Sequence, residues 1–464
     1  MNLFSTLILG FFVSHVVHAV EPTPKDAQTK ESIGAIKGWA GRSDLKISLP
    51  VTKFTLPNGL TVLLLEDHGV PMVSYHTWYR VGSRDEYPGV TGAAHMLEHM
   101  MFKGAKKYSG QDFDRIFHEN GITNNAFTTN DYTGFYENLP SSKLDLVMDI
   151  EVDRMNSLLL NPQHLLSERE VVKEERRWRV DNNPMGLLRE LMMATVFKVH
   201  PYKWPVIGYT KDIENYDADK LRFFYNSFYG PNNAVLVVVG DFKTSKVRSM
   251  IEDYYGKLPK RSIPEKKYEL EPIQAVQQNA TLKRDVQNTS FVVAFQSPKQ
   301  GDPEMYAIDL AANILGYGSS SRLHKVLVYQ KEYATSAYAY NSSMKDSGVF
   351  AVGVNLKPGF IIDDALDITY REIWKLRNKI VDDKELEKAK TQVIKDIVDS
   401  LKTMDGKARS LAVNEIMTGS YESLFTDLEK YQAVKGEDIK SAVEKYMTQS
   451  RRSIVSLQPR LKKE

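Results

Sequence analysis

Apolar and polar positions alternate along this chain in blocks that predict both strands and helices. Apolar runs at 54–56 and 60–64 flank Pro57-Asn58-Gly59, and an Asn-Gly pair between such runs is typical of a β-hairpin. The continuous apolar run at 234–239, closed by a glycine, predicts a buried strand. The same reasoning predicts strands at 71–81, 125–137, 291–295 and 348–354, and helices at 111–119, 143–159, 167–180, 366–380 and beyond residue 382.

The pattern recurs in two parts of the chain at an offset of 218 positions. At this offset Leu221 aligns with Ile439 and Leu236 aligns with Ile454, without a gap. Both copies read as a helix, a short turn and a closing strand, which favours two related halves. Generic helix-to-strand patterning is the alternative explanation. Strands that alternate with paired helices in each half predict a layered α/β fold.

The composition between the two halves marks a linker. The segment 258–272 combines three prolines with a run of charged residues, which is typical of a connection between domains. We therefore expect one half at 49–257 and a second half at 273–464, with a loose polar arm at 20–48 before them.

The first 19 residues predict a secretory signal peptide. Residues 3–17 are mostly apolar, and Val17-His18-Ala19 resembles a small-residue cleavage site. The run is too short to span a membrane stably, and no later stretch is long and apolar enough for a transmembrane helix. We expect an exported protein, periplasmic or secreted. Because no Lys or Arg precedes the run, a buried first strand or helix is the alternative.

Net charge and cysteine content limit the partners and the metal ligands that can be expected. The formal net charge of the 464-residue chain is +2, which gives no reason to expect nucleic acid or an anionic membrane as a partner. The chain has no cysteine, so any bound metal must be held by His, Asp or Glu side chains.

The segment 92–104, GAAHMLEHMMFKG, places His95, Glu98 and His99 in apolar surroundings. Side chains four positions apart lie on one face of a helix, so His95 and His99 can bind one metal ion while Glu98 reaches a water molecule beside it. The His-x-x-Glu-His order is the inverted form of a known zinc-protease helix. Zinc is bound readily by imidazole and carboxylate groups. Two packed histidines on an amphipathic helix are the alternative.

A third metal ligand is expected from the segment 167–180, SEREVVKEERRWRV. On a helix, one face is shared by Glu168, Val171, Val172 and Glu175. If the valines mark the inward face, the two glutamates point inward as well. Buried carboxylates are rare unless they are paired or bound to a metal. An exposed helix rich in salt bridges is the alternative.

Several segments resemble the pitrilysin/insulinase family of zinc peptidases, the inverzincins, in the branch of the mitochondrial processing peptidases. They cover most of the chain after residue 50 and are specific because they follow one another in the family's order. They are LPNGL at 56–60, GSRDE at 82–86, HMLEH at 95–99, NAFT at 125–128, EREVVKEE at 168–175, HPYKWPVIG at 200–208, YGPNNAVLVVVGD at 229–241 and YGSSSRL at 317–323.

The resemblance implies a fold and a ligand set. The fold consists of two similar halves, each with an antiparallel sheet and packed helices, which face each other across a chamber. Zn²⁺ would be bound by His95, His99 and Glu175, all in the half at 49–257. Glu168 would be the carboxylate that orients one of the histidines.

The resemblance also implies the roles of three further residues. Glu98 would take a proton from the attacking water and pass it to the leaving amine. Asn125 and Ala126 match the edge strand to which an extended peptide substrate adds. For Asn125, a simple turn residue is the alternative.

The chain departs from the family at two positions in its second half. Self-sufficient members supply an Arg and, seven positions later, a Tyr near the zinc, but alignment on SSRL places Val328 and Thr335 there. We therefore expect a zinc-bearing subunit of a heterodimer whose second homologous subunit supplies the pair; a homodimer stays open. Compensation by a neighbouring tyrosine is the alternative, from Tyr329, Tyr333 or Tyr338.

The predicted function is that of a zinc-dependent endopeptidase acting on extended peptides outside the cytoplasm. The competing prediction is a non-catalytic binding or scaffold subunit of the same fold. That class usually lacks ligand or base residues, whereas all four are present here, namely His95, Glu98, His99 and Glu175.

Overall fold

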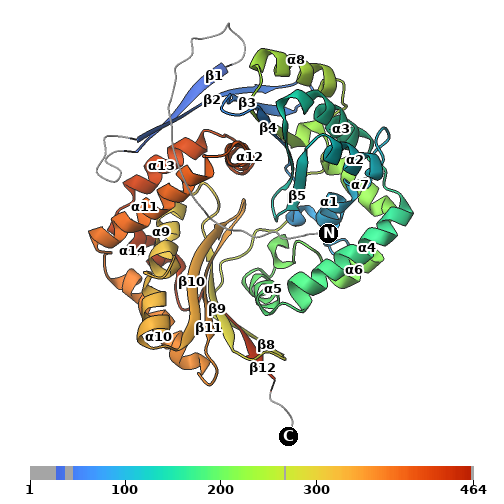
Figure 1. The fold of residues 1–464 in the computed structure, drawn as a ribbon. Coiled ribbons are helices and arrows are strands. Elements are labelled where there is room, and N and C mark those ends of the chain that lie inside the picture. The colour runs from blue at the N-terminus through green and yellow to red at the C-terminus, as the bar shows by residue number, and fades with distance from the viewer. Residues whose placement is uncertain (1–27, 37–44, 266–267, 461–464) are drawn as a thin grey trace.

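Two β-sheets and their surrounding helices form the protein, and each sheet belongs to one half of the chain (Figure 1). The computed structural model describes residues 28–36, 45–265 and 268–460. The predicted signal peptide at 1–19 lies outside these residues. No helix of the described part combines the length and apolar character needed to cross a membrane.

The N-terminal sheet has seven strands in the order β1-β2-β3-β7-β4-β6-β5. The predicted hairpin at Asn58 joins β2 to β3. The arm expected to be loose at 20–48 instead contains β1, which pairs with β2. The strands are β1 (Gln28–Ile36), β2 (Leu45–Thr55), β3 (Thr61–Glu66), β4 (Met72–Tyr79), β5 (Thr123–Thr128), β6 (Thr133–Pro140) and β7 (Ala234–Gly240).

The C-terminal sheet has five strands in the order β10-β11-β9-β12-β8. In each sheet one pair is parallel, β3 with β7 and β8 with β12. All other pairs in both sheets are antiparallel, which agrees with the expected antiparallel sheet in each half. The strands are β8 (Gln278–Arg284), β9 (Ser290–Ser297), β10 (Ala334–Ser343), β11 (Gly348–Leu356) and β12 (Ser453–Pro459).

The two halves repeat one design, as the sequence offset predicts. Helix α7 (Ala218–Phe228) and helix α14 (Gly436–Tyr446) begin and end 218 positions apart. The strand after each helix, β7 or β12, enters its sheet between a parallel and an antiparallel neighbour. The order β5-β6-β4-β7-β3 corresponds strand for strand to β10-β11-β9-β12-β8, which confirms two related halves.

Helices cover one face of each sheet and enclose a separate apolar core. In the N-terminal half this core includes residues of α1, α2, α3 and α8 together with α7. In the C-terminal half it includes residues of α9, α10, α11 and α14. The bounds are α1 (Ala93–Met100), α2 (Gly110–Glu119), α3 (Leu144–Ser157), α4 (Pro162–Arg176), α6 (Thr210–Asn215), α8 (Thr244–Tyr255), α9 (Met305–Gly316), α10 (Ile362–Asn378), α11 (Asp383–Ser400) and α13 (Ser423–Ala433).

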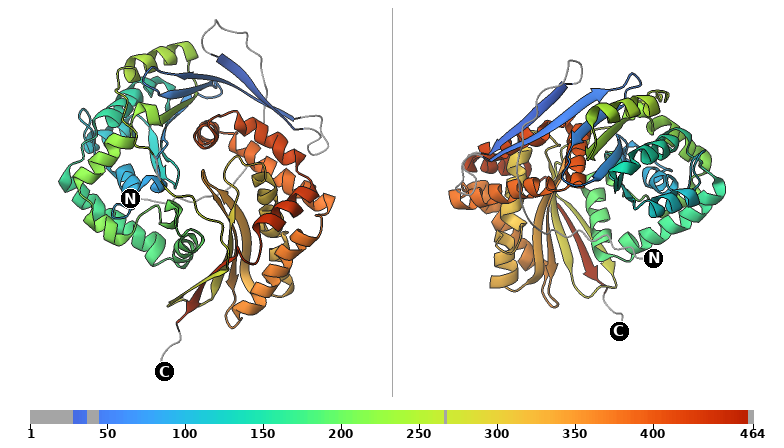
Figure 2. Two further views of the ribbon diagram at one scale, coloured as in Figure 1. Left: turned by 180° about the vertical axis from the view of Figure 1, so that it is seen from behind. Right: turned by 45° about the horizontal axis from the view of Figure 1, so that its top comes forward.

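The halves exchange one helix across their interface (Figures 1 and 2). Helix α5 (Pro184–Val196), from the N-terminal half, packs on β9 and β12 of the C-terminal sheet. Helix α12 (Met404–Thr418), from the C-terminal half, packs on β4 and β7 of the N-terminal sheet. An ion pair between Lys53 and Glu415, at 2.7 Å, fastens α12 to β2. Each sheet thus buries its second face under a helix of the other half.

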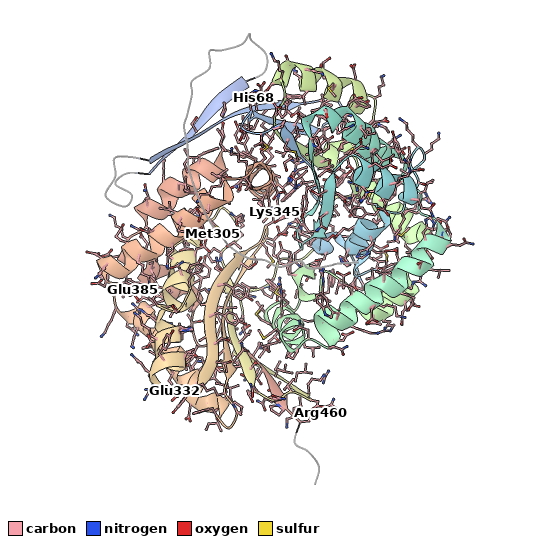
Figure 3. The ribbon with its side chains drawn as sticks, in the orientation of Figure 1. His68, Met305, Glu332, Lys345, Glu385 and Arg460 are labelled. Carbon is pink, nitrogen blue, oxygen red and sulfur yellow. The ribbon has the colours of Figure 1, made fainter. Side chains whose placement is uncertain are left out.

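A buried polar junction also ties the halves together. The guanidinium of Arg84 lies 3.1 Å from Asp131 in the N-terminal half and 2.8 Å from Asp346 in the β10–β11 turn. The backbone N–H of Lys345 donates to Asp131 at 3.1 Å, and Figure 3 shows Lys345 between the two sheets. Tyr202 donates its hydroxyl to Asp131 at 2.6 Å. This junction explains why the segments GSRDE and HPYKWPVIG carry buried polar residues.

Two predicted elements differ from the structure. The single strand expected at 125–137 is a hairpin, β5 and β6, whose turn is closed by a hydrogen bond from Thr129 N–H to Tyr132 C=O at 2.8 Å. The helix expected at 167–180 begins earlier, at Pro162, where the Asn161 side chain caps it. It continues past α4 as a π-helical turn over Arg177–Asp181.

Candidate metal centre

Helix α1 carries the His-x-x-Glu-His motif. The glycine at its start, Gly92, has a left-handed backbone conformation. Gly92 has φ +86°, a conformation that other residues rarely adopt. The buried carboxylate of Glu86 accepts hydrogen bonds from the N–H groups of Gly92, at 2.8 Å, and Ala94, at 2.9 Å. It thereby satisfies two of the donors that the start of a helix leaves without partners.

Close backbone packing fixes the start of α1 against the segment HPYKWPVIG. A Cβ atom on Gly92 would lie 2.4 Å from the Ile207 carbonyl, and one on Gly208 would lie 2.3 Å from the Thr91 carbonyl. Neither position has room for a side chain. The two glycines therefore let two loops touch directly and set the position of the motif helix.

The structure brings the three predicted ligands together. His95 and His99 stand one turn apart on α1 with their ring centroids 4.8 Å apart. Glu175, near the end of α4, places its Oε2 atom 3.2 Å from His99 Nε2 and 3.5 Å from His95 Nε2. One donor atom from each residue lies within 4.8 Å of the other two.

The donor set fits a zinc ion. Glu175 Oε2 is buried and meets no hydrogen-bond donor of suitable geometry among the described residues, yet it faces two imidazole nitrogens. Two imidazoles and one carboxylate form a typical catalytic zinc set with three protein ligands. Arg179 on the π-helical turn lies 3.0 Å from the other oxygen of Glu175 and holds the carboxylate in place.

A second carboxylate contacts the far side of His99. Glu168 Oε2 lies 3.2 Å from His99 Nδ1, and Lys103 Nζ lies 2.5 Å from Glu168 Oε1. When Nδ1 donates to Glu168, the lone pair of Nε2 points toward Glu175. Val171 does not mark the inward face as expected, because it is 48% exposed; Val172 is fully buried.

Burial and neighbouring charges separate the pKa values of the ligands. Burial, with the neighbouring His99, lowers the pKa of His95 to about 3. Burial acts the same way on His99, but contacts with Glu168 and Glu175 outweigh it and raise the pKa of His99 to about 9. Burial alone would raise the pKa of Glu175, yet both imidazoles and Arg179 lower it to about 2. Glu175 is thus ionised at neutral pH, the form that binds metal.

Glu98 lies on α1 beside the ligands and contacts the sheet edge. Burial raises the pKa of Glu98 to about 7, against an opposing effect of a hydrogen bond from Thr128. That bond runs from Thr128 Oγ1 to Glu98 Oε2 and measures 2.5 Å. A carboxyl group with a pKa near neutrality can both accept and return a proton.

The predicted peptide-binding residues lie on β5, the last strand of the N-terminal sheet. β5 pairs with β6 alone among the described strands, so its other edge is open to an additional strand. Asn125 is exposed and accepts a hydrogen bond from the Ala126 N–H at 2.8 Å.

Several residues around the metal centre were not predicted from sequence, namely Glu86, Lys103, Thr128 and Arg179. Glu86 and Thr128 both lie inside segments that carry the family resemblance, GSRDE and NAFT, but the resemblance does not show what they contact. Glu86, Lys103 and Thr128 act on residues of other elements, which local spacing does not reveal. Arg179 lies four positions after Glu175, an ordinary helical ion-pair spacing that could have indicated its role.

Comparison with known proteins agrees with this geometry. Residues 61–210 match the family model described as Insulinase (Peptidase family M16), and residues 215–393 match the model described as Peptidase M16 inactive domain. The zinc protease PqqE of Helicobacter pylori is 30% identical over 87% of this chain and 92% of its own length. The uncharacterized zinc protease YmxG of Bacillus subtilis is 25% identical over 86% of this chain and 96% of its own.

Solved structures agree as well. The crystal structure of a protease from Helicobacter pylori superposes with a TM-score of 0.85 at 29% identity, covering 89% of this chain and all of that chain. The chain also has the fold of one part of the periplasmic protease PqqL of Escherichia coli, with a TM-score of 0.73 at 18% identity over 88% of this chain and 47% of that chain. With His95, His99 and Glu175 gathered as a metal site, the chain belongs to the insulinase family of zinc metalloproteases, peptidase family M16.

Proposed function

We propose that this chain is the zinc-bearing subunit of a two-subunit endopeptidase that hydrolyses extended peptides. The observation that carries the proposal is one site that combines three metal ligands with a carboxylate beside them. Zinc bound there would polarise the scissile carbonyl and lower the pKa of a water molecule.

Side chains of this protein would transfer the proton and orient the metal ligands. Glu98 takes a proton from the attacking water and passes it to the leaving amine. Glu168 keeps the His99 ring oriented toward the metal, 3.2 Å from its Nδ1 atom. Glu98 lies close to the peptide-binding strand because Thr128, the last residue of β5, contacts it.

The substrate is an extended peptide that adds to the open edge of β5. Main-chain hydrogen bonds along such an edge bind a peptide whatever its side chains, and pockets beside it select among them. Asn125 and Ala126 lie in the middle of this strand, where a bound peptide would meet them.

The second subunit is proposed from the C-terminal half. Val328 lies in a π-helical segment at His324–Gln330, and Thr335 lies at the start of β10. Glu332, between them, is at the outer end of the C-terminal half in Figure 3, far across the view from α1. These positions carry no Arg or Tyr and lie away from this chain's own ligands.

Of the three tyrosines that could compensate, Tyr329 is 63% exposed, with its ring edge-on to His324 at a centroid distance of 5.1 Å. Tyr333 and Tyr338, like the nearby Arg322, are engaged elsewhere. Arg322 donates from its Nε to Glu385 on α11 at 2.9 Å. Tyr333 packs against Phe360 with ring centroids 4.7 Å apart. The ring of Tyr338 occupies the space above Gly353, where a Cβ would lie 2.2 Å from it. These contacts favour an Arg and Tyr pair from a partner chain, as in the processing-peptidase branch.

Expression of the chain alone and with its co-purifying partners tests the proposal. We expect chelator-sensitive cleavage of an internally quenched peptide only when a second homologous chain is present. A Glu98→Gln variant should keep zinc and lose cleavage. Full activity of a purified homo-oligomer would refute the division of labour, and full activity of Glu98→Gln would refute Glu98 as the base.

A non-catalytic scaffold is the second candidate function. It predicts that no combination of chains cleaves peptide in a Glu98-dependent way. We further propose export of the protein, which rests on the predicted signal peptide at 1–19. Amino-terminal sequencing of the mature protein tests this, with Val20 expected as the first residue.

A further inference from the structure

We infer that Thr128 is a positioning residue that holds Glu98 in place and links the peptide-binding strand to the metal centre. This inference rests on the proposed function, because it concerns how the proposed base is oriented. Thr128 acts through Glu98 and touches neither the ligands nor the reacting atoms in this account.

The contact itself is short and directional. Thr128 Oγ1 donates to Glu98 Oε2 at 2.5 Å. In the ionised form that takes a proton from water, the Glu98 carboxylate can only accept. Hydrogen bonds to charged acceptors are shorter and stronger than neutral ones. A free glutamate side chain samples several rotamers, and this hydrogen bond opposes that freedom. It engages only Oε2 of Glu98, so Oε1 stays available for a proton.

The direction of the Thr128 side chain follows from the strand. Successive side chains of a strand point to opposite faces, so Thr128 and Ala126 share the face that meets α1, while Phe127 points to the other face. There the Phe127 ring meets Trp78 edge-on, with centroids 5.0 Å apart, and Arg409 of α12 lies 4.9 Å from its centre.

The residues on either side of Thr128, Phe127 and Thr129, are both held by packing or hydrogen bonds. Gly134 on β6 leaves the space that the Phe127 ring fills, since a Cβ there would lie 2.6 Å from the ring. The carbonyl of Thr129 accepts from the N–H of Ser83 at 3.1 Å, and its N–H donates to the carbonyl of Tyr132 at 2.8 Å. The hydroxyl of Thr128 is therefore presented to Glu98 by a rigid strand end.

In this arrangement, strand β5 both orients the base Glu98 and binds the substrate. A peptide that adds to β5 would be aligned by the same strand that orients Glu98. Removal of the hydroxyl should therefore disturb the base without removing the peptide-binding edge. The expected signature is a fall in kcat with KM and zinc content unchanged.

A comparison of Thr128→Val and Thr128→Ser tests the inference in the zinc-loaded protein, purified with any chain that accompanies it. Valine keeps the shape and removes the hydroxyl, whereas serine keeps the hydroxyl. With an internally quenched peptide, Thr128→Val should lower kcat by about tenfold or more. Thr128→Ser should retain most of kcat, and both variants should bind the same amount of zinc.

Crystal structures of both variants supply a readout that does not depend on activity. We expect the Glu98 carboxylate to move in Thr128→Val and to stay in place in Thr128→Ser. An unmoved Glu98 or an unchanged kcat in Thr128→Val would overturn the inference, as would equal loss in both variants. Glu98→Gln, measured alongside, separates this from the proposed function: its full activity would refute the function, whereas Thr128→Val alone refutes only the positioning role.

Discussion

The two halves of the molecule share a strand order, a closing helix and a closing strand, yet they differ in chemistry. In the N-terminal half, α1 follows β4, contacts α4 and carries two histidines and a glutamate. In the C-terminal half, α9 follows β9 and contacts α11, but its sequence MYAIDLAANILG has no histidine. Its one carboxylate, Asp309, accepts from Tyr431 at 2.5 Å and Asn341 at 2.7 Å.

The comparison shows that the fold does not determine the site. The same arrangement of helix on sheet buries a metal centre in one half and a satisfied polar group in the other. The chemistry depends on a few side chains whose removal should leave the scaffold intact. Substitutions matched between the halves can test this directly.

The largest effect is expected from loss of a ligand. Glu175→Gln should lower zinc affinity by more than 100-fold and abolish cleavage, because an amide neither carries the charge nor replaces the carboxylate at the metal. The matched control is Glu385→Gln on α11, the counterpart of α4, where Glu385 pairs with Arg322. Metal analysis after dialysis measures both. Equal zinc loss in the two variants would show that the comparison between halves is mistaken.

The junction between the halves should give the next largest effect. Arg84→Met would leave the buried Asp131 and the partly exposed Asp346 without their cation. Removing one partner of a buried ion pair typically costs about 3–5 kcal/mol. Chemical denaturation followed by tryptophan fluorescence measures the loss. Arg371→Met, which removes a pair that is 71% exposed on each side, should change stability by less than about 1 kcal/mol. Similar values for the two variants would argue against a junction that holds the halves together.

Spacing along the chain predicts the two histidine ligands, whereas the family resemblance implies Glu175 as the third. The four-residue spacing of His95 and His99 alone places both on one helix face. The interval from Glu168 to Glu175 predicted two inward carboxylates, and both are largely buried although the supporting reading of Val171 was wrong. The repeat offset of 218 positions likewise predicts two related halves.

Contacts between distant segments could not be predicted in this way. The pair Arg84 and Asp346 is separated by 262 positions, and no local pattern links them. The exchange of α5 and α12 between halves is likewise a tertiary event. The polar pair Asn130-Asp131 lies in a turn within a β-rich run, and the single strand predicted for that run is therefore a hairpin in the structure. Strands β8 and β10 are not predicted from sequence. Both lie at sheet edges, where half-exposed positions weaken the apolar pattern that marks a strand.

A smaller effect is expected from the carboxylate behind His99. Glu168→Gln should lower zinc affinity by about 10–100-fold, the usual cost of losing a partner that orients a ligand. Competition with a chromophoric chelator measures it. Glu170→Gln, on the same helix but with its carboxylate 66% exposed, is the control and should bind zinc like the wild type. A Glu168→Gln variant with wild-type affinity would exclude an orienting role.

The smallest effect is expected in the pH dependence of stability, through Asp346 in the polar junction between the halves. Burial alone would raise the pKa of Asp346, but His200, Arg84 and Tyr268 lower it from 3.8 to about 2. A carboxylate with a depressed folded-state pKa stabilises the protein above pH 4, and that contribution is lost as pH falls toward 2. Because Asp346 is partly exposed, solvent screening reduces this contribution to roughly 1 kcal/mol. The difference in unfolding free energy between wild type and Asp346→Asn should shrink as pH falls from 5 to 3. A constant difference would contradict this assignment.

The most direct measurement of the central claim is a crystal structure of the zinc-soaked protein with anomalous diffraction at the zinc edge. The account predicts a single strong anomalous peak bonded to His95, His99 and Glu175, with Glu98 beside it and no peak at α9. A Glu175 carboxylate turned to solvent, two imidazoles pointing apart, or zinc bound elsewhere would contradict it.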